Sequence, residues 1–462
     1  MIEVGPLVGM IQIPGIRFGV ADVVSLATLN SAIEDVLKYL YAAKLESLHV
    51  QAAFLAQCLD AWLEATQRRA DLEDDDKLDP DNAKWKQLQI DAAAMIPDPS
   101  ARDAAITAIE RDFADNEDDY GRKLYLIENC LYGADIQPIA IQITKLRFFI
   151  SLVCDQRTNR SKKDNHGIRP LPNLETKFVA ADTLIALNPE RHLDTEILAN
   201  PLIKQKEADL QRVRHDHFAA TTRQKKLALQ KRDRKLRDEL ARELIKTTFA
   251  DRESSRQLAD WDPYDPQQSA IFFEPLWMFD QSMAEGFDLI IGNPPYIQIQ
   301  KFPTAQKAIW KAQGFRTYGA TADVYCLFYE RGAQLLKEGG HLGYITSNKW
   351  MRAGYGSALR GYLANAVDTT SVLDFGMAQN FGAATTYTCV VLFANRSSNG
   401  KTQSCYATDD LAAMANPARY FEKNRVVQRD LADDPWVVIS KDRQRIKDLV
   451  EAQGVPRGLG PA

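Results

Sequence analysis

Apolar and polar positions recur with two different periods along this chain, and the change of period divides it into regions. Up to about residue 72, alanine and leucine recur at helical spacing, as in VLKYLYAAKLESLHVQAAFLAQCLDAWL. The acidic stretch DLEDDDKLDPDN predicts a solvated linker, and residues 85–119 predict further helix. From Lys123 onward strand-like and helix-like segments alternate, which predicts βαβ units on a parallel sheet.

The first of these units places an acid at the end of a strand. The strand predicted in ENCLYG ends at Gly133, Asp135 lies just beyond it, and Pro138 opens a helix where its missing N–H costs nothing. A carboxylate at a strand tip commonly accepts hydrogen bonds from two ribose hydroxyls. Capping of the helix by Asp135 explains the spacing equally well. Asp182, after the strand in ETKFVAADTL, would accept from an adenine amino group or cap its own turn.

The most informative segment is FDLIIGNPPY, residues 287–296. Apolar residues without helical spacing, closed by Gly292 and two prolines, predict a buried parallel strand that ends in a rigid loop at the lip of a cleft. The Asn293 side-chain oxygen and the Pro294 carbonyl would accept both protons of a conjugated amino group, and Tyr296 would offer a flat face for stacking. This pattern suits methylation of an exocyclic or amide nitrogen. A proline-ended strand entering a surface turn explains the same four letters.

An insertion of different composition separates Asp182 from this loop, over about residues 200–285. From Lys204 to Lys246, 14 Lys or Arg stand against 7 Asp or Glu, in the pattern of a long helix or helical hairpin with a basic face. Such a face would neutralise phosphates. A solvated helix with i,i+4 ion pairs explains the same run. His215 and His217 fall on different helix faces, so no metal site is expected there.

After the loop the alternation resumes. DVYCLFYERGAQLLKEGGHLGYITS predicts a helix that Gly339 and Gly340 end, followed by a strand. GSALRGYLAN predicts a helix, TSVLDFG a strand and TYTCVVLFAN the last strand. Phe381, between these two strands, would form the second wall of a stacking pocket or pack beneath its own loop. Residues 396–462 predict an incomplete following domain.

Composition narrows the class of protein. A chain of 462 residues with 45% hydrophobic content buries two or three cores, so one large domain with appendages is expected. The net charge of -5 is mild, and a nucleic-acid partner would need a local basic surface. Six scattered cysteines without a C-x-x-C pair predict reduced, mostly buried thiols in a cytoplasmic protein. No signal peptide or membrane-spanning stretch is recognisable.

Several blocks, in family order, resemble the adenine-specific (N6) DNA methyltransferase module of type IIG restriction-modification and phage-defence enzymes. They lie within roughly residues 77–395 and read KLDPDNAKWKQLQIDAAAMIPDP, DYGRKLYLIENCLYGADIQPIAIQITKLRFFISL, RPLPNLETKFVAADTL, FDLIIGNPPYIQIQ and TTYTCVVLF. The resemblance implies an α/β fold with a Rossmann-like S-adenosylmethionine-dependent methyltransferase sheet. Residues 1–76 would form a helical segment that the family does not match, and residues 396–462 would begin an incomplete target-recognition region.

The resemblance also assigns a cofactor site. In that family the residue at Asp135 holds the ribose of S-adenosylmethionine, and the residue at Asp182 holds the cofactor adenine. Ile136 and Thr183, the neighbours of these two acids, would belong to the same cofactor-binding site. No metal is implied.

The catalytic loop follows from the same resemblance. Asn293, Pro294, Pro295 and Tyr296 match the loop around a flipped-out adenine, with Tyr296 and Phe381 stacking on the base. The methyl group would pass directly from the sulfonium to the amino nitrogen. Double-stranded DNA is the implied partner, a nuclease or specificity subunit is a further candidate, and no membrane is involved.

One family feature is missing. A strand leading into an acid and a glycine-rich turn, which wraps the methionine part of the cofactor, should precede KLDPDN. From Ala21 to Tyr120 the chain has no glycine, so no loop there brings its backbone close enough to a ligand. The upstream glycines of GPLVGMIQIPGIRFG lack the acid, and the family's nuclease is not recognisable either.

The sequence therefore predicts a truncated or rearranged adenine-N6 DNA methyltransferase. Two alternatives stay open. The missing glycine loop is also expected of a catalytically inactive DNA-binding or assembly subunit. Asn-Pro-Pro-Tyr also occurs in enzymes that methylate a glutamine amide of release factors, so a protein glutamine-N5 methyltransferase is the second alternative.

Overall fold

The fold is taken from a computed structural model, which describes most of the chain between residues 130 and 452. The described residues are 8–11, 102, 124, 126–128, 130–154, 168, 172–187, 200–220, 222–246, 252–279, 283, 285–376, 387–407, 413, 417–429 and 431–452. Apart from residues 8–11 and 102, the helices predicted over residues 1–76 and 85–119 and the acidic linker lie outside this set, as does Phe381. The described residues fall into two compact units, unit 1 up to residue 283 and unit 2 from residue 285.

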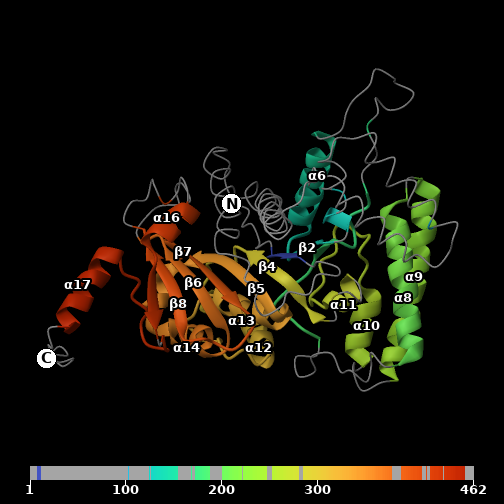
Figure 1. The fold of residues 1–462 in the computed structure, drawn as a ribbon. Coiled ribbons are helices and arrows are strands. Elements are labelled where there is room, and N and C mark those ends of the chain that lie inside the picture. Colours follow the sequence, from blue (N-terminus) through green and yellow to red (C-terminus); the bar gives the residue numbers. More distant parts are fainter. Residues whose placement is uncertain are drawn as a thin grey trace. The chain divides into compact units, whose positions relative to one another are not determined.

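Unit 1 contains strands in the order β3-β2-β1 (Figure 1). The central strand β2 (Leu131–Asp135) is buried along its whole length, pairs in parallel with β3 (Phe178–Ala180) and pairs antiparallel with β1 (Val8–Ile11). Helix α6 (Pro138–Cys154) connects β2 to β3 and packs on both. The predicted βαβ unit and the helix start at Pro138 are thus confirmed. Asp135 is the last residue of β2, however, because it pairs in register with Ala180.

The insertion forms a helical hairpin, as predicted. Helices α8 (Pro201–Phe218) and α9 (Arg223–Ile245) lie side by side (Figure 1), and the short helices α10 (Arg252–Asp260) and α11 (Pro275–Met278) follow. Side chains at the N-caps start both long helices: Asn200 accepts from Leu202 N–H and Thr222 from Lys225 N–H. The inner side of α9 is apolar at Leu236, Leu240 and Leu244, which are buried at i, i+4 and i+8.

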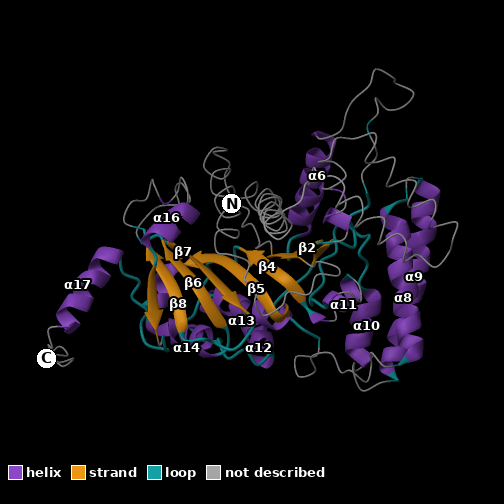
Figure 2. Ribbon diagram, in the orientation of Figure 1, coloured by secondary structure: helices purple, strands orange, loops and turns teal. Residues whose placement is uncertain are grey.

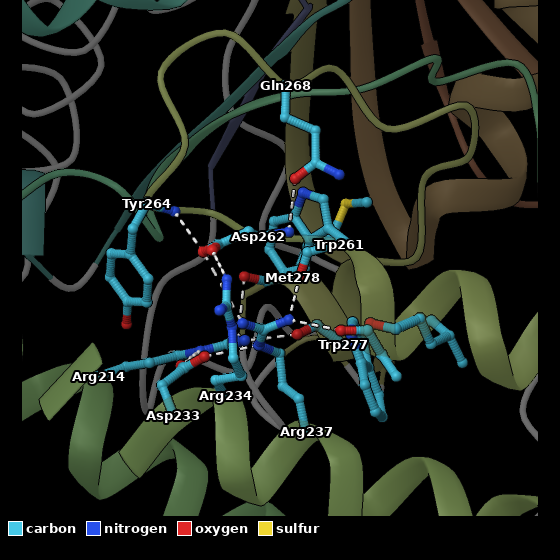
Figure 3. A network of polar contacts seen from close by, with 12 residues as sticks. Arg214, Asp233, Arg234, Arg237, Trp261, Asp262, Tyr264, Gln268, Trp277 and Met278 are labelled. Atoms are coloured by element: carbon cyan, nitrogen blue, oxygen red, sulfur yellow. Dashed lines mark hydrogen bonds and ion pairs between the residues drawn. The ribbon is translucent and has the colours of Figure 1, made fainter. Parts of the chain in front are cut away.

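A cluster of buried charges joins the two long helices. Arg214 of α8 and Arg237 of α9 both point at the carboxylate of Asp233 (Figure 3), with Nε to Oδ distances of 3.0 and 2.7 Å. Burial alone would raise the pKa of Asp233, but the two guanidinium groups outweigh burial and hold the pKa below its ordinary value. Arg214 and Arg237 are therefore internal, so a count of charges in the sequence overstates the basic surface of the insertion.

In unit 2 the strands follow the order β4-β5-β7-β6-β8-β9, and Figure 2 labels all of them except β9. Strand β4 is parallel to β5 and β6 is parallel to β8, and the other neighbours are antiparallel. Helix α13 (Tyr325–Leu335) packs on β5 (Leu336–Ser347), and helix α14 (Ser357–Asn365) packs on β6 (Asp368–Asp374). The two helices lie next to each other. The strands are β4 (Phe287–Gly292), β5 (Leu336–Ser347), β6 (Asp368–Asp374), β7 (Thr388–Ala394), β8 (Lys401–Tyr406) and β9 (Val426–Arg429). The helices are α12 (Thr304–Ala312), α13 (Tyr325–Leu335), α14 (Ser357–Asn365), α16 (Pro417–Asn424) and α17 (Lys441–Ala452).

Two features of unit 2 differ from the sequence-based expectation. Helix α13 ends at Leu335 and β5 begins at once, so Gly339 and Gly340 lie within the strand instead of ending the helix. The Asn395 side chain donates to the carbonyls of Leu336 and Lys337, which satisfies backbone groups that a glycine cap would otherwise serve. The sheet also continues past residue 395, the expected end of the core, through β8 and β9.

The described cysteines confirm the predicted burial. Cys130, Cys326, Cys389 and Cys405 are free, buried thiols, and burial raises the pKa of Cys405 to about 12. In the described part of the chain, no three His, Cys, Asp or Glu side chains are placed to hold a metal ion. No helix there is both long and apolar enough to cross a bilayer.

Two glycines with positive φ make a matched test of how β4 is placed. At Gly286 (φ 94), which precedes β4, an added Cβ would lie 2.6 Å from Lys337 N and 2.8 Å from Leu335 O. At Gly339 (φ 74) an added Cβ would meet nothing within 4 Å. We expect Gly339→Ala to lower the free energy of unfolding by about 1 kcal/mol, the cost of left-handed backbone alone. Gly286→Ala should cost about 3 kcal/mol or more, because backbone overlap adds to that strain. Urea denaturation measures both, and equal losses would contradict this placement of β4.

Candidate functional site

Asp135 ends β2 with a carboxylate that is almost completely buried. Its exposed fraction is 1%, and its Oδ1 accepts a hydrogen bond from the Gln137 N–H at 2.7 Å. Its Oδ2 is buried and has no hydrogen-bond partner among the described residues. Burial raises the pKa of Asp135 to about 7, against the opposing effect of the Gln137 N–H. Oδ1 thus makes the capping contact that one interpretation of the sequence expected. Oδ2 is a hydrogen-bond acceptor without a donor among the described residues.

The other residues predicted for the cofactor lie at the same end of the unit 1 sheet. Ala181 N–H donates to Asp135 C=O at 2.8 Å, and Asp182 follows directly. Asp182 Oδ1 accepts from Leu184 N–H at 3.1 Å, which is the turn-capping contact expected from the sequence. Ile136 is 45% exposed, whereas Thr183 is buried. The structure therefore brings Asp135, Ile136, Asp182 and Thr183 together, because β2 and β3 are parallel neighbours in the predicted βαβ unit.

The strand on the other side of β2 does not supply the missing glycine motif. The register of β1 places Val8 opposite Ala134 and Ile11 opposite Leu131. Since β1 is antiparallel, its carboxyl end points away from Asp135. A strand that leads into a cofactor-wrapping loop must be parallel to β2, so that both carboxyl ends meet at one edge. The antiparallel direction of β1 therefore agrees with the sequence analysis, which did not accept the glycines of GPLVGMIQIPGIRFG as the missing glycine-rich turn.

The predicted loop in unit 2 follows a strand that is buried over all six residues. Strand β4 runs parallel to β5, with Gly292 opposite Tyr344, and ends where Asn293 begins. Pro294 is buried, and Asn293, Pro295 and Tyr296 are partly exposed. The prediction of an apolar strand that delivers this loop is confirmed, and the loop's polar side chains reach solvent.

Tyr296 has a contact that sequence reasoning missed. Its hydroxyl donates to Asn293 Oδ1 at 2.8 Å and to the Ile345 carbonyl at 3.2 Å. Burial raises the pKa of Tyr296 well above its ordinary value, so the hydroxyl keeps its proton. The Asn293 amide is thereby oriented by a residue of its own loop, and one lone pair of its oxygen stays available to a ligand. In the sequence, the only sign of this contact is that Tyr296 follows Asn293 by three positions, with two prolines between them.

A second layer of tyrosines lies behind Tyr296. The Tyr325 ring meets the Tyr296 ring edge to face, with centroids 6.0 Å apart and planes at 89°. Tyr325 and Tyr355 share a hydroxyl hydrogen bond of 3.0 Å, and Tyr355 donates to Asp323 Oδ2 at 3.1 Å. Backbone bonds from Val324 N–H to Ile297 C=O and from Ile299 N–H to Ala322 C=O, both 2.8 Å, hold this layer against the loop. These supporting residues also escaped the sequence analysis, because their contacts join segments about 30 residues apart.

The candidate residues divide between the two units. Those around Asp135 and Asp182 belong to unit 1, and the loop from Asn293 to Tyr296 belongs to unit 2. Phe381 lies outside the described residues.

Comparison with known proteins identifies the family to which the sequence is similar. The family model of the Eco57I restriction-modification methylase matches residues 129–381. RM.Eco57I of Escherichia coli, a type II restriction enzyme and methyltransferase, is 30% identical over 168 residues, which cover 36% of this chain and 16% of that protein. The type II methyltransferase M.XhoI of Xanthomonas vasicola is 27% identical over 197 residues, covering 38% and 36%. The chain thus spans only a minor part of the length of either relative.

Among solved structures, the ATP-dependent type ISP restriction-modification enzyme LlaBIII bound to DNA aligns over 91% of this chain and 22% of its own. Its identity is 14% and its TM-score 0.38, a similarity too low to define the fold.

The family match takes in more than half of the chain. It begins just before β2, contains Asp135, Asp182 and the loop from Asn293 to Tyr296, and extends beyond β6. This chain therefore belongs to the Eco57I restriction-modification methylase family.

Proposed function

We propose that this chain carries the modification activity of a restriction-modification system. It transfers a methyl group from S-adenosylmethionine to the exocyclic amino nitrogen, N6, of an adenine in double-stranded DNA. The observation that carries the proposal is the loop at the end of β4, where Tyr296 fixes the Asn293 amide with one oxygen lone pair left over. We place the activity in the cytoplasm, in association with a nuclease or specificity subunit that acts on the same DNA.

The residues of unit 1 fit the proposed cofactor. A ribose diol carries two O–H donors, and Asp135 Oδ2 is a buried acceptor that has no donor. The Asp182 carboxylate would accept from the cofactor adenine, and the exposed Ile136 side chain and Thr183 would border it. When bound, S-adenosylmethionine supplies a methyl group activated by its sulfonium.

The residues of unit 2 would prepare the acceptor nitrogen. The adenine must leave the base stack, because its amino group is unreachable within a stacked duplex. Asn293 Oδ1 and the Pro294 carbonyl would then accept hydrogen bonds from the two amino N–H groups, which raises the electron density on the nitrogen. The N–CH3 bond would form as the sulfonium S–CH3 bond breaks, and one amino proton would then be lost to solvent. The Tyr296 ring offers the base a flat face, and the Tyr325 ring keeps that face in place. Phe381 would supply the opposite face.

The hairpin would contribute sequence-independent affinity for DNA. Several exposed cations of α9 form no ion pair with the described residues, among them Lys225, Lys231 and Arg232. Others follow the solvated-helix interpretation, since Lys235 pairs with Glu239 at 3.8 Å and Lys246 with Glu243 at 3.0 Å. We assign the unpaired cations to phosphate contacts.

One observation favours a second candidate function, a catalytically inactive DNA-binding or assembly subunit. The strand beside β2 runs antiparallel, so it leads no loop to the Asp135 edge. Cofactor binding by the chain separates the two candidates, because the inactive subunit has no need of it.

The catalytic loop is tested by methyl transfer. Asn293→Ala should lower kcat for transfer of labelled methyl groups to duplex DNA by about a hundredfold or more, because it removes an acceptor made for the reacting group. Tyr296→Phe keeps the ring and should lower kcat by roughly tenfold, the effect of one lost orienting hydrogen bond. The control is Tyr318→Phe, whose hydroxyl takes no part in the contact with Asn293 or Ile345. Methylation of release factors but not of DNA would overturn the choice of substrate.

The cofactor site is tested by the pH dependence of binding. Asp135 accepts from both ribose hydroxyls only when ionised, and its pKa in the cofactor-free chain is about 7. Binding therefore releases a proton below pH 7. Calorimetry should show the affinity for S-adenosylmethionine rising about tenfold per pH unit up to about pH 7 and levelling above it. Asp135→Asn should bind weakly with no such slope. Absence of binding at every pH would support the inactive subunit.

The hairpin surface is tested by the salt dependence of DNA binding. The triple variant Lys225→Gln, Lys231→Gln and Arg232→Gln should reduce the slope of log K against log salt by about 2 to 3, since each phosphate contact contributes about 0.9. The matched control removes three exposed cations that already have acidic partners, through Arg212→Gln, Lys235→Gln and Lys246→Gln. Equal slopes in the two variants would refute the assignment.

A further inference from the structure

The buried charges of the hairpin also hold the segment that joins α10 to α11. The exposed fractions of the Arg214, Asp233 and Arg237 side chains are 5%, 0% and 1%. Both arginines use Nε for Asp233, which leaves their terminal nitrogens to bind elsewhere (Figure 3). Residues 261–274, here called the linking segment, run between the two short helices that these nitrogens reach.

Each guanidinium binds carbonyls where a short helix ends. Arg237 Nη1 donates to Ala259 C=O at 2.9 Å and to Trp261 C=O, at the end of α10. Arg214 Nη1 donates to the carbonyls of Trp277, Met278 and Phe279 at 2.8, 3.1 and 3.0 Å, at the end of α11. These carbonyls have no partner within a helix, so a buried cation both satisfies them and fixes their position. Arg237 thus anchors the start of the linking segment, Arg214 anchors the end of α11 that follows the segment, and both arginines bind one carboxylate.

Further side chains keep the first half of the linking segment closed. The Gln268 side chain accepts from Asp262 N–H at 2.8 Å and donates to Asp260 C=O at 3.3 Å. Arg234 of α9 forms an ion pair with Asp262 (Figure 3). Gln268 therefore closes the first half of the segment against the end of α10, and Arg234 ties Asp262 to the hairpin.

The second half of the linking segment contacts the candidate cofactor residues. Ser269 Oγ donates to the Ile136 carbonyl at 2.9 Å. Ala270 N–H donates to Ala180 C=O, and Asp182 N–H donates to Ala270 C=O, both at 2.9 Å. The linking segment thus contacts the residue next to Asp135 and also Asp182 itself, and Arg237 and Arg214 hold the chain at the start of the segment and just beyond its end.

We propose that Arg214 and Arg237 are positioning residues for the S-adenosylmethionine site of unit 1. They act through Asp233 and the linking segment, and they set cofactor affinity without touching the cofactor. This inference rests on the proposed function. Packing alone gives no reason for charges here, since apolar side chains of equal volume would stabilise the hairpin as well. Only two planar, forked donors hold five carbonyls in fixed places.

The test separates positioning from general stability by comparing two buried arginines. Arg237→Lys keeps the charge and loses the fork. It should weaken binding of S-adenosylmethionine about tenfold, measured by calorimetry, and raise KM for the cofactor equally, while kcat at saturating cofactor and DNA stays within about twofold. Arg360 of α14 is the matched control, because it is 2% exposed and donates to the carbonyls of Trp350 and Ala353 in unit 2. Arg360→Lys should lose similar thermal stability and keep the wild-type cofactor affinity.

Ser269→Ala provides an independent measurement that does not disturb the buried charges. Loss of the Ser269 hydroxyl should weaken cofactor binding by roughly three- to fivefold with an unchanged melting temperature. Wild-type affinity in both Arg237→Lys and Ser269→Ala would overturn the positioning role, as would a loss of kcat with unchanged affinity. If the unaltered chain binds no S-adenosylmethionine, the proposed function itself fails, and the positioning role is rejected with it.

Discussion

The exit of a buried strand is the constraint on which both parts of the candidate site depend. Residues of β2 and β4 are paired and covered along their whole length, so the backbone leaves each strand at one place and in one direction. A polar residue at that point, Asp135 or Asn293, has little freedom to turn elsewhere. Its remaining hydrogen-bonding capacity is then directed at whatever enters the edge of the sheet. The chemistry follows from the rigidity of apolar strands as much as from the polar residues themselves.

Sequence reasoning succeeded where the signal is local. Pro138 starts a helix, the basic insertion is helical, and the apolar run before Asn293 is a strand, because each feature is decided by a few neighbouring residues. Sequence reasoning failed where the conformation of a segment depends on residues far away in the sequence. The glycines at 339 and 340 resemble a helix stop, but the Asn395 amide, far along the chain, satisfies the backbone and allows the strand to begin early. The direction of β1 likewise has no local signal.

The candidate site shows the same division. The residue types at Asp135, Asp182 and Asn293 were recognisable from their spacing, whereas their supports were not. The hydrogen bond from Tyr296 to Asn293, and the hold of Arg214 and Arg237 on the linking segment, are properties of the folded chain. The charge count of the hairpin treats all its cations alike, although some are internal helix caps and others face solvent. The internal and solvent-facing cations can be told apart by their burial in the folded chain, but not from the composition of the sequence.

Burial makes Asp135 a weaker acid than an ordinary aspartate. A carboxyl with a pKa of about 7 is half neutral at neutral pH, so the folded chain avoids much of the penalty of an isolated buried anion. The ribose hydroxyl groups of the proposed cofactor would replace that proton with two donors of their own. Under the proposed function, capture of the methyl donor would acidify an unbuffered solution, and the heat of binding would vary with the ionisation enthalpy of the chosen buffer.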